Sequence, residues 1–227
     1  MFMAEIEKIN NDFVNLFREG RPLLENGCGK AMNVCREEAF RHFEALGGVP
    51  YKTEDYWYTD LSSVLGLDYK IVLKYIAQDV DLKEVFRCAV PDLLTNLILT
   101  VNGWYFKENA PIEIPEGVIV CGLQEAGVKY PHLLESHYNR YTPAAAKDGM
   151  IALNTAFAQD GLFVYIPKNT VVERPLQVVN LLRAKADLMA FQRNLIVVEA
   201  GAQATMLVCD HTLSDNRFLM NNTTEVY

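Results

Sequence analysis

Cys209, Asp210 and His211 form the stretch whose residue types come closest to a chemical site. A cysteine and a histidine two residues apart lie on the same face of a β-strand, where both could ligate a metal ion. A metal site needs at least one more ligand, and no neighbouring cysteine or histidine supplies it. Asp210 belongs to the opposite face of such a strand, so it cannot orient His211 as the acid of a catalytic triad does. We therefore favour a buried thiol and a histidine at a strand end over a metal site.

Three other short patterns approximate known motifs but miss the spacing that the chemistry requires. His132 and His137 are five residues apart, which places them about 140° apart around a helix, whereas the HExxH motif of zinc proteases places its histidines one turn apart. The segment 27–31 (GCGKA) lacks the first glycine of a phosphate-binding loop and has Ala31 where serine or threonine is required. We expect it to link two helices, and we expect no ATP binding by this chain. The segment 122–127 (GLQEAG) misses the GxGxxG spacing, so we expect a turn there.

The other cysteines, carboxylates and aromatic residues form no recognisable catalytic set. Cys88 and Cys121 lie in apolar sequence, which is typical of core residues. Asp160 and Glu199 are isolated, so no carboxylate pair for acid–base chemistry is visible. An aromatic triplet could bind a ligand, but we favour its anchoring a loop onto the helices; it consists of Tyr56, Trp57 and Tyr58. The sequence therefore predicts no catalytic residue, no metal site and no cofactor held by this chain.

The composition indicates which classes of partner are excluded and in which cellular compartment the protein is expected. The 227 residues carry a formal net charge of −8 and a pI near 5.1, which argues against nucleic acid and against an anionic membrane surface as partners. No apolar run approaches the roughly 18 residues of a membrane-spanning helix. Glu5 and Glu7, without a long apolar block, argue against a secretory signal. Five scattered cysteines do not suggest a disulfide framework, so a reducing cytoplasm is expected.

The first 46 residues predict a helical hairpin. Apolar residues recur at helical spacing over 6–17, and the segment 20–22 (GRP) is expected to end this helix. A second apolar stripe is expected to stop at the glycine pair 47–48. The two stripes are Ile6, Ile9, Phe13, Leu16 and Phe17, followed by Met32, Cys35, Ala39, Phe43 and Leu46. An ordered loop with aromatic anchors is expected over 49–61, and a weaker helix over 68–76.

From about residue 85 the pattern changes to short strands. The pair Asn102-Gly103 between two apolar runs is the strongest hairpin signal. A further strand is expected over 118–123, and helices over 131–140 and 147–158. The strands expected after residue 160 are 162–166, 175–182, 189–191, 194–198, 205–209 and 223–227. Among them, Val164, Ile166, Val178 and Leu181 are expected to face inward or to stack on neighbouring residues, with Pro167 and Pro175 at corners or edges.

Short strands in this number suggest a sandwich, a barrel or a β-solenoid. Uneven alternation and turns of unequal length favour the solenoid, although no strict sequence period is visible. We predict an α+β, mainly β protein with three parts: a helical region over 1–84, a mixed connecting region over 85–159 and a β region over 160–227. Because the sequence ends inside an expected strand, we expect a longer protein, and the open strand edge could pair with another copy.

Three segments, taken in order, resemble the SufB/SufD family of the SUF iron–sulfur cluster assembly system. The first is GGVPYKTEDYWYTDL over 47–61, which is similar to a segment of the SufD branch. The second is DGLFVYIPKNTVVERPLQVV over 160–179, and the third is NLIVVEAGAQATMLVCDHTLSD over 194–215; both resemble segments shared by the SufB and SufD branches. A helical hairpin ahead of the first segment suits the SufD branch.

This resemblance implies a right-handed parallel β-helix, of which the chain would hold the first coils. It also implies a non-catalytic scaffold subunit acting with a SufB-like paralogue and a SufC-like ABC-type ATPase, with the nascent cluster on the full complex. The late CSHG-like segment of the family and the helical domain after it are not in this sequence, so we carry over no site residue. The alternatives are a β-helix enzyme acting on polysaccharide, which would place carboxylates in an open groove, and a structural β-solenoid, which would show a regular repeat.

Overall fold

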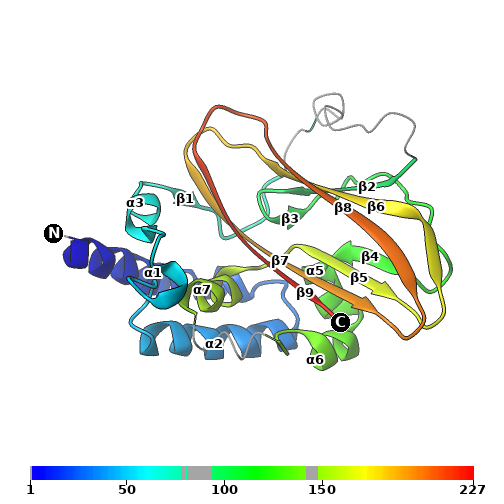
Figure 1. Cartoon of the computed structure of the whole chain (residues 1–227), viewed down its shortest axis with the longest axis horizontal. Helices are drawn as coiled ribbons and strands as arrows, with labels where there is room; N and C mark the ends of the chain where they lie inside the picture. The colour runs from blue at the N-terminus through cyan, green and yellow to red at the C-terminus, as the bar shows by residue number, and fades with distance from the viewer. Residues whose placement is uncertain (1, 78–79, 81–93, 142–147) are drawn as a thin grey trace.

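The computed structural model describes residues 2–77, 80, 94–141 and 148–227. It places a layer of helices against two β-sheets with long curved strands (Figure 1). The helical elements are α1 (Phe2–Glu25), α2 (Lys30–Ala45), the 3-10 turn η1 (Glu54–Tyr56), α3 (Leu61–Leu65), α5 (Leu123–Lys129), α6 (Pro131–His137) and α7 (Gly149–Phe157). The strands are β1 (Lys70–Ile71), β2 (Asn96–Val101), β3 (Trp104–Tyr105), β4 (Ile119–Gly122), β5 (Leu162–Ile166), β6 (Val171–Leu182), β7 (Leu188–Val198), β8 (Gln203–Thr212) and β9 (Phe218–Val226).

Helices α1 and α2 form the predicted hairpin and pack on α7. Phe17 of α1 stacks on Phe40 of α2 with ring centroids 3.8 Å apart, and its other neighbour is the ring of Phe157 in α7. The predicted helix end at 20–22 is wrong, because α1 continues through Pro22 to Glu25. Leu24 in that last turn is fully buried, and its burial offsets the hydrogen bond that proline cannot donate.

The second helix ends where the sequence predicts, and it buries three residues of the predicted stripe together with Arg36 and Phe40. The glycine pair 47–48 follows it with φ angles of 79° and 92°, a conformation that glycine adopts at no steric cost. Its buried residues are Met32, Arg36, Ala39, Phe40 and Phe43. The charge of Arg36 excluded it from the predicted stripe. Its guanidinium donates hydrogen bonds to the carbonyl oxygens of Ala156 and Ala158, at the end of α7 where the helix dipole favours a cation.

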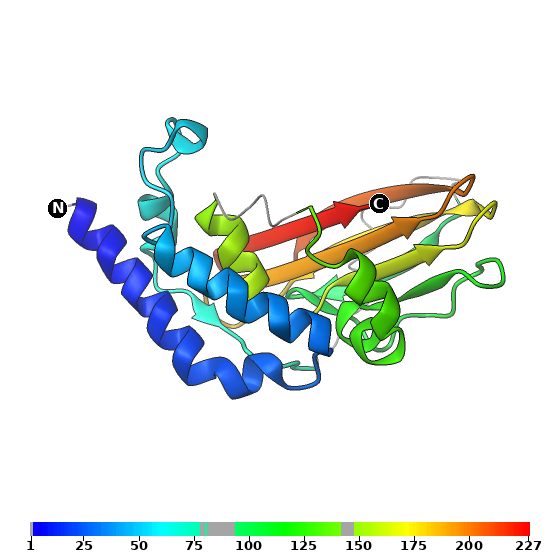
Figure 2. The same ribbon diagram turned by 90° about the horizontal axis from the view of Figure 1, so that it is seen from below.

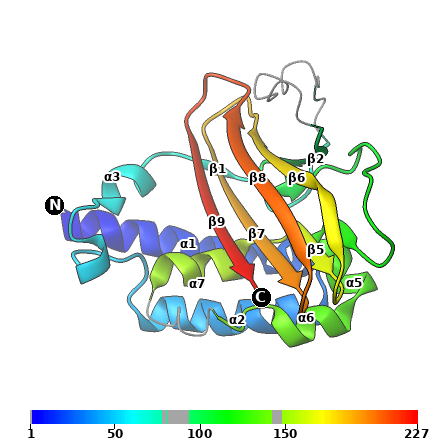
Figure 3. The ribbon, with the colours of Figure 1, turned by 45° about the vertical axis from the view of Figure 1, so that its right-hand side comes forward.

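The strands form two sheets with mixed pairing. In the first sheet, β1 and β5 pair in parallel with one edge of β7, β9 pairs in parallel with the other edge, and β4 is antiparallel to β5. In the second, β2 lies between antiparallel β3 and parallel β6, and β8 pairs with β6. Figure 3 shows the long strands β6 to β9 curving together. The described residues thus show helices plus mixed sheets and no closed parallel β-helix, and helices occupy as much of the chain as strands.

From β5 onward, successive strands alternate between the two sheets, and parallel neighbours keep a nearly constant distance in sequence. Leu188 of β7 pairs with Phe218 of β9, 30 residues later. Phe163 of β5 pairs with Leu195 of β7, 32 residues later. This spacing is a structural repeat for which the sequence shows no strict period.

Pro167 and Pro175, which we predicted at corners or edges, lie at positions where the sheet loses no backbone hydrogen bond. Pro167 begins the turn after β5, and its carbonyl oxygen accepts a hydrogen bond from the Thr170 N–H. Pro175 lies in β6 at the register shift between Val172 and Leu176, where a missing N–H is tolerated.

The four residues predicted to face inward are buried. Val164, Ile166 and Val178 belong to the apolar cluster between the two sheets, and Leu181 belongs to the neighbouring cluster of β2 and β6. All four are at most 2% exposed. Because Val178 and Leu181 are an odd number of residues apart in β6, they point to opposite faces of the strand, and both faces are covered there.

The predicted hairpin at Asn102-Gly103 is confirmed. Both residues have left-handed backbones, with φ angles of 52° and 85°, as a two-residue turn between twisted strands requires. Val101 and Trp104 pair on either side. A Cβ atom at Gly103 would meet the carbonyl oxygen of Phe191, so the turn is packed against β7 and needs glycine for close approach as well as for conformation.

Several local predictions are wrong. The segment 68–76 contains β1 instead of a helix, because Lys70 and Ile71 pair with the far end of β7. The segment 122–127 is no turn but begins α5. The strands predicted over 189–191 and 194–198 are one strand, β7. Among the described helices, none has both the length and the apolar character needed to span a bilayer. Cys88 lies outside the described residues.

Candidate functional site

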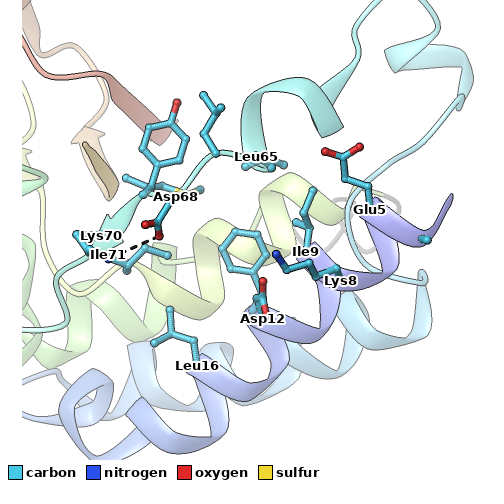
Figure 4. A pocket seen from close by; sticks show the side chains of 15 residues that line it. Glu5, Lys8, Ile9, Asp12, Leu16, Leu65, Asp68, Lys70 and Ile71 are labelled. Atoms are coloured by element: carbon cyan, nitrogen blue, oxygen red, sulfur yellow. Dashed lines mark ion pairs between the residues drawn. The ribbon is translucent and has the colours of Figure 1, made fainter. Parts of the chain in front are cut away.

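A groove of about 810 Å³ opens between α1 and the segment 65–71 (Figure 4). Its inner surface is apolar because α1 presents helically spaced residues and β7 adds a side chain from beneath. The buried lining residues are Ile9, Phe13, Leu65 and Met189. Leu16 and Ile71, which are half-buried, extend the apolar surface towards solvent.

Charged residues of both signs surround this groove. Glu5, Lys8 and Asp12 come from α1, and Asp68 and Lys70 come from the opposite wall (Figure 4). The Lys70 ammonium lies 3.6 Å from the Asp68 carboxylate, with both side chains largely exposed. Such pairs contribute little to stability. The charged residues form a rim of mixed sign around the groove, and such a rim can orient a bound segment.

The groove offers binding surface and no set of reactive groups. Its described lining contains neither cysteine, histidine, serine nor threonine, and its one hydroxyl belongs to Tyr69. An apolar floor with a charged rim is the arrangement with which proteins hold apolar segments of a partner. The geometry therefore suits the binding of an apolar segment.

The Cys209–His211 stretch lies in β8 with the side-chain directions that the sequence predicts. Cys209 and His211 are half-buried on one face, and Asp210 is exposed on the other. Asp210 accepts a hydrogen bond of 2.8 Å from the Asn180 amide. Cys209 packs on the apolar cluster that includes Leu99. In the part of the chain that the structure describes, no three side chains of His, Cys, Asp or Glu gather as metal ligands.

The two α6 histidines do not face a common site. His137 places Nδ1 2.9 Å from the carbonyl oxygen of Leu133, and its ring meets the edge of Tyr227. His132 is exposed at the start of the same helix. The structure therefore keeps them apart, in agreement with their spacing of five residues.

The two glycine-containing segments, 27–31 and 122–127, allow helices to pack closely together. The segment 27–31 links α1 to α2, as predicted. A Cβ atom at Gly29 would meet the backbone of Gly127 in α5, so these two glycines allow the helix connection to touch α5 directly. The predicted turn at 122–127 is a helix because its first N–H groups find acceptors in a distant residue, Asp160, and in its neighbour Gly161.

The buried thiols are not prepared for chemistry. Burial raises the pKa of Cys121 to about 12. Burial also raises the pKa of Cys28, although the Arg36 guanidinium, 3.6 Å from its sulfur, opposes the shift. Because the thiolate is the nucleophile and the metal ligand, the raised pKa values disfavour the reactive form of the buried Cys121 and the half-buried Cys28. The predicted core role of Cys121 is confirmed.

Asp160, which the sequence presented only as an isolated acid, is a buried carboxyl group with a raised pKa. It is 7% exposed, and burial raises its pKa to about 6 against backbone N–H groups that lower it. Its two carboxylate oxygens accept hydrogen bonds from the N–H groups of Gln124 (2.9 Å) and Tyr105 (3.0 Å). It therefore joins the start of α5 to the β2–β3 hairpin. Glu199 lies beyond the other end of β5, where its N–H bonds to Ile166.

A second buried network joins α6 and α7 to the last strand. Arg193 and Glu225 form an ion pair of 2.9 Å with both side chains at most 2% exposed. Arg193 also donates to Thr155, and Glu225 accepts from the backbone N–H groups of Asn139 and Tyr141. Sequence alone gave no signal for this network, because its members come from four distant segments.

The aromatic triplet anchors its loop through one residue only. The Tyr56 hydroxyl donates a 2.9 Å hydrogen bond to Asp148, and burial together with that bond raises the Tyr56 pKa. Trp57 and Tyr58 are 65% and 98% exposed, so the prediction that they anchor the loop onto the helices is wrong.

The fold defines a class of protein: a helical hairpin packed on two sheets whose strands alternate between layers, with grooves and exposed loops as its candidate sites. A sequence profile of the SufBD protein N-terminal region matches residues 7–178. The chain therefore belongs to the SufB/SufD family.

Individual relatives agree with this assignment. The chain is 33% identical over 135 residues to the iron–sulfur cluster assembly SufBD family protein ABCI9 of Arabidopsis thaliana, covering 60% of this chain and 28% of that protein. It is 35% identical over 106 residues to the SufBD family protein slr0074 of Synechocystis, covering 46% and 21%. It is 26% identical over 210 residues to the SufBD family protein SAUSA300_0822 of Staphylococcus aureus, covering 85% and 45%. The chain thus spans less than half the length of these relatives.

Proposed function

We propose that this chain is a SufD-like, non-catalytic scaffold subunit in iron–sulfur cluster assembly. The observation that carries the proposal is the family match over 7–178, together with relatives named for iron–sulfur cluster assembly. The thiols Cys28 and Cys121 have raised pKa values, and no metal-ligand cluster occurs within the described residues. Both observations support a subunit that presents surfaces and holds no cofactor of its own.

The assignment to the SufD branch rests on the N-terminal half. The helical hairpin of α1 and α2 leads directly into the aromatic loop over 47–61, the order that suits this branch. We also propose that residues 160–227 form the first coils of a right-handed parallel β-helix, after a helical region over 1–84 and a connecting region over 85–159. The alternation of strands between two sheets and the 30-residue spacing of parallel partners support this proposal.

The proposed partners are a SufB-like paralogue and a SufC-like ABC-type ATPase, in the cytoplasm, with the nascent cluster carried by the complex. The groove of Figure 4 supplies one surface on which an apolar segment of such a partner can bind. The proposal includes no nucleic acid and no membrane as partner, in keeping with the net charge of −8.

Co-expression tests this function. The chain, in its full reading frame and with an affinity tag, is produced together with the SufB-like and SufC-like proteins of the same organism, and the purified material is assayed for stoichiometry, iron and sulfide. We expect a stable three-component complex, and the ATPase alone as a control should not be retained by an unrelated tagged protein. A stable monomer that ignores both partners would refute the proposal, and cleavage of an acidic polysaccharide would favour an enzyme instead.

A further inference from the structure

The loop between α2 and α3 carries two adjacent aromatic side chains at its tip. Trp57 is 65% exposed and Tyr58 is 98% exposed. Figure 2 shows this loop projecting away from the helices and from both sheets. Tryptophan and tyrosine are the residues most enriched among those that dominate binding energy at protein interfaces, so this tip resembles an unoccupied contact.

Hydrogen bonds anchor the tip on both sides. Tyr56 is tied to Asp148, whose other carboxylate oxygen caps the start of α7. On the other side, Asp60 accepts hydrogen bonds from the Ser62 N–H and hydroxyl and so caps α3. Backbone hydrogen bonds close the turn between, including one from the Thr59 N–H to the carbonyl oxygen of Tyr56. A preorganised loop loses little conformational entropy when its aromatic residues are buried by a partner.

The tip is also acidic. Glu54, Asp55 and Asp60 flank the two aromatic rings, against one lysine, Lys52. Hydrogen bonds from Ser62 lower the pKa of Asp60, so its carboxylate is charged at neutral pH. The complementary surface must therefore combine an apolar cavity with a basic rim.

The same chain carries such a cavity elsewhere. A pocket of about 540 Å³ lies between the segment 70–76, the β2–β3 turn and the segment 183–188. Its apolar lining includes Val72, Trp104 and Leu188. Three lysines contribute to the lining, Lys70, Lys74 and Lys185, of which Lys70 also pairs with Asp68. No acidic residue occurs in its described lining, although the net charge of the chain is −8.

Hydrogen bonds between neighbouring turns hold the wall of this pocket in place. Asn102 donates from Nδ2 to the carbonyl oxygen of Arg183 (2.8 Å) and accepts from the Arg183 N–H (2.9 Å). Ser214 bridges to Ala184 by donating to its carbonyl oxygen. These bonds fix the turns of successive strands beside one another, and so they fix the distance between the apolar floor and the basic rim.

We propose that the aromatic tip of one copy binds in the basic pocket of a second copy of this chain. The tip and the pocket are complementary in charge and in apolar character, and no tip residue lines the pocket of its own chain. The contact is heterologous, so each copy uses both surfaces and association continues into rings or short chains. This inference does not rest on the proposed function.

Sedimentation velocity of the full chain at increasing concentration tests the contact. A contact of this small size predicts weak, concentration-dependent association that weakens further as salt is added. Replacing the exposed aromatics in the double variant Trp57→Ala/Tyr58→Ala should raise the dissociation constant at least about tenfold. Circular dichroism should be unchanged, because neither side chain packs in the core.

Charge reversal gives the sharper test. Glu54→Lys/Asp55→Lys reverses the tip, and Lys74→Glu/Lys185→Glu reverses the rim; each variant alone should remain monomeric. An equimolar mixture of the two should associate again, because the unchanged tip of the rim variant fits the unchanged rim of the tip variant, and the reversed tip fits the reversed rim. The control Lys30→Glu/Lys168→Glu changes two exposed lysines elsewhere and should associate better than the rim variant.

Three results would overturn the proposal. The first is a monomer at the highest attainable concentration in low salt. The second is association that the tip and rim variants leave unchanged. The third is failure of the reversed pair to associate when mixed. Trp57 and Trp104 are the two tryptophans of the chain, one on each proposed surface, so a shift of tryptophan emission should accompany association and be lost in the tip variant.

Discussion

Raising the pH from 4 to 7 should weaken the native state through Asp160. The carboxyl group titrates near 3.8 when solvated, and burial raises its pKa to about 6 in the folded chain. The native state therefore binds a proton more tightly than the unfolded state does. Its stabilising effect is fully present below pH 3.8 and is lost as the pH rises through 6. At about 1.4 kcal/mol for each pH unit between the two pKa values, the loss amounts to about 3 kcal/mol.

The variant Asp160→Asn isolates this effect. Its amide is neutral at every pH, so its stability lacks the carboxyl contribution. One N–H group, of Gln124 or Tyr105, would face the amide nitrogen instead of an oxygen, which costs a constant amount of about 1–3 kcal/mol. The informative quantity is therefore the difference between wild type and variant at each pH, which should move by about 3 kcal/mol in favour of the variant between pH 4 and pH 7.

Urea unfolding followed by circular dichroism at pH 4, 5, 6 and 7 measures this difference. The matched control Asp12→Asn removes an exposed carboxylate on α1 and should not reproduce the change. A difference that stays constant within about 1 kcal/mol, or that moves in favour of wild type as the pH rises, would show that the backbone N–H groups outweigh desolvation at Asp160.

Three further substitutions should destabilise the chain for separate reasons, each measurable by the same urea unfolding at pH 7. Arg36→Met should cost about 2–4 kcal/mol, because two buried carbonyl oxygens lose their donors; a loss below 1 kcal/mol would contradict this. Glu225→Gln should cost about 3–5 kcal/mol by leaving Arg193 buried without its anionic partner, and a neutral effect would mean that the pair is not buried in solution. Gly103→Ala, which meets the backbone of β7, should cost about 2–3 kcal/mol and clearly more than Gly47→Ala, which has a similar φ angle but open space around it; equal losses would refute the packing argument.

Local periodicity predicted much of the fold. The helical hairpin and the turn at Asn102-Gly103 followed from apolar spacing and from the conformational freedom of asparagine and glycine, which depend on neighbours along the chain. The burial of Val164 and Val178 also agrees with the prediction. Continuation of α1 through Pro22 did not follow, because it depends on how deeply Leu24 is buried by the rest of the molecule.

The candidate sites were harder to predict than the elements. The sequence correctly indicated that Cys209 and His211 share a face of β8 without Asp210. It wrongly predicted that Trp57 and Tyr58 anchor their loop on the helices. The type of a residue shows that its ring is apolar, but not whether another part of the fold covers that ring. The groove of Figure 4 combines α1 with the segment 65–71 and Met189, and no local pattern brings these parts together.

The sequence by itself determined the helical hairpin, the turn at Asn102-Gly103 and the burial of four strand residues and, through three segments over 47–61, 160–179 and 194–215, the resemblance to the family. Only the tertiary structure decided which charged residues are buried and which aromatic residues are exposed. Asp160 became a buried carboxyl group because Gln124 and Tyr105, 36 and 55 residues away, bring their N–H groups to it. The physical reason is that helix and strand periodicity depends on near neighbours, whereas the solvation of a charge depends on which distant segments the fold packs around it.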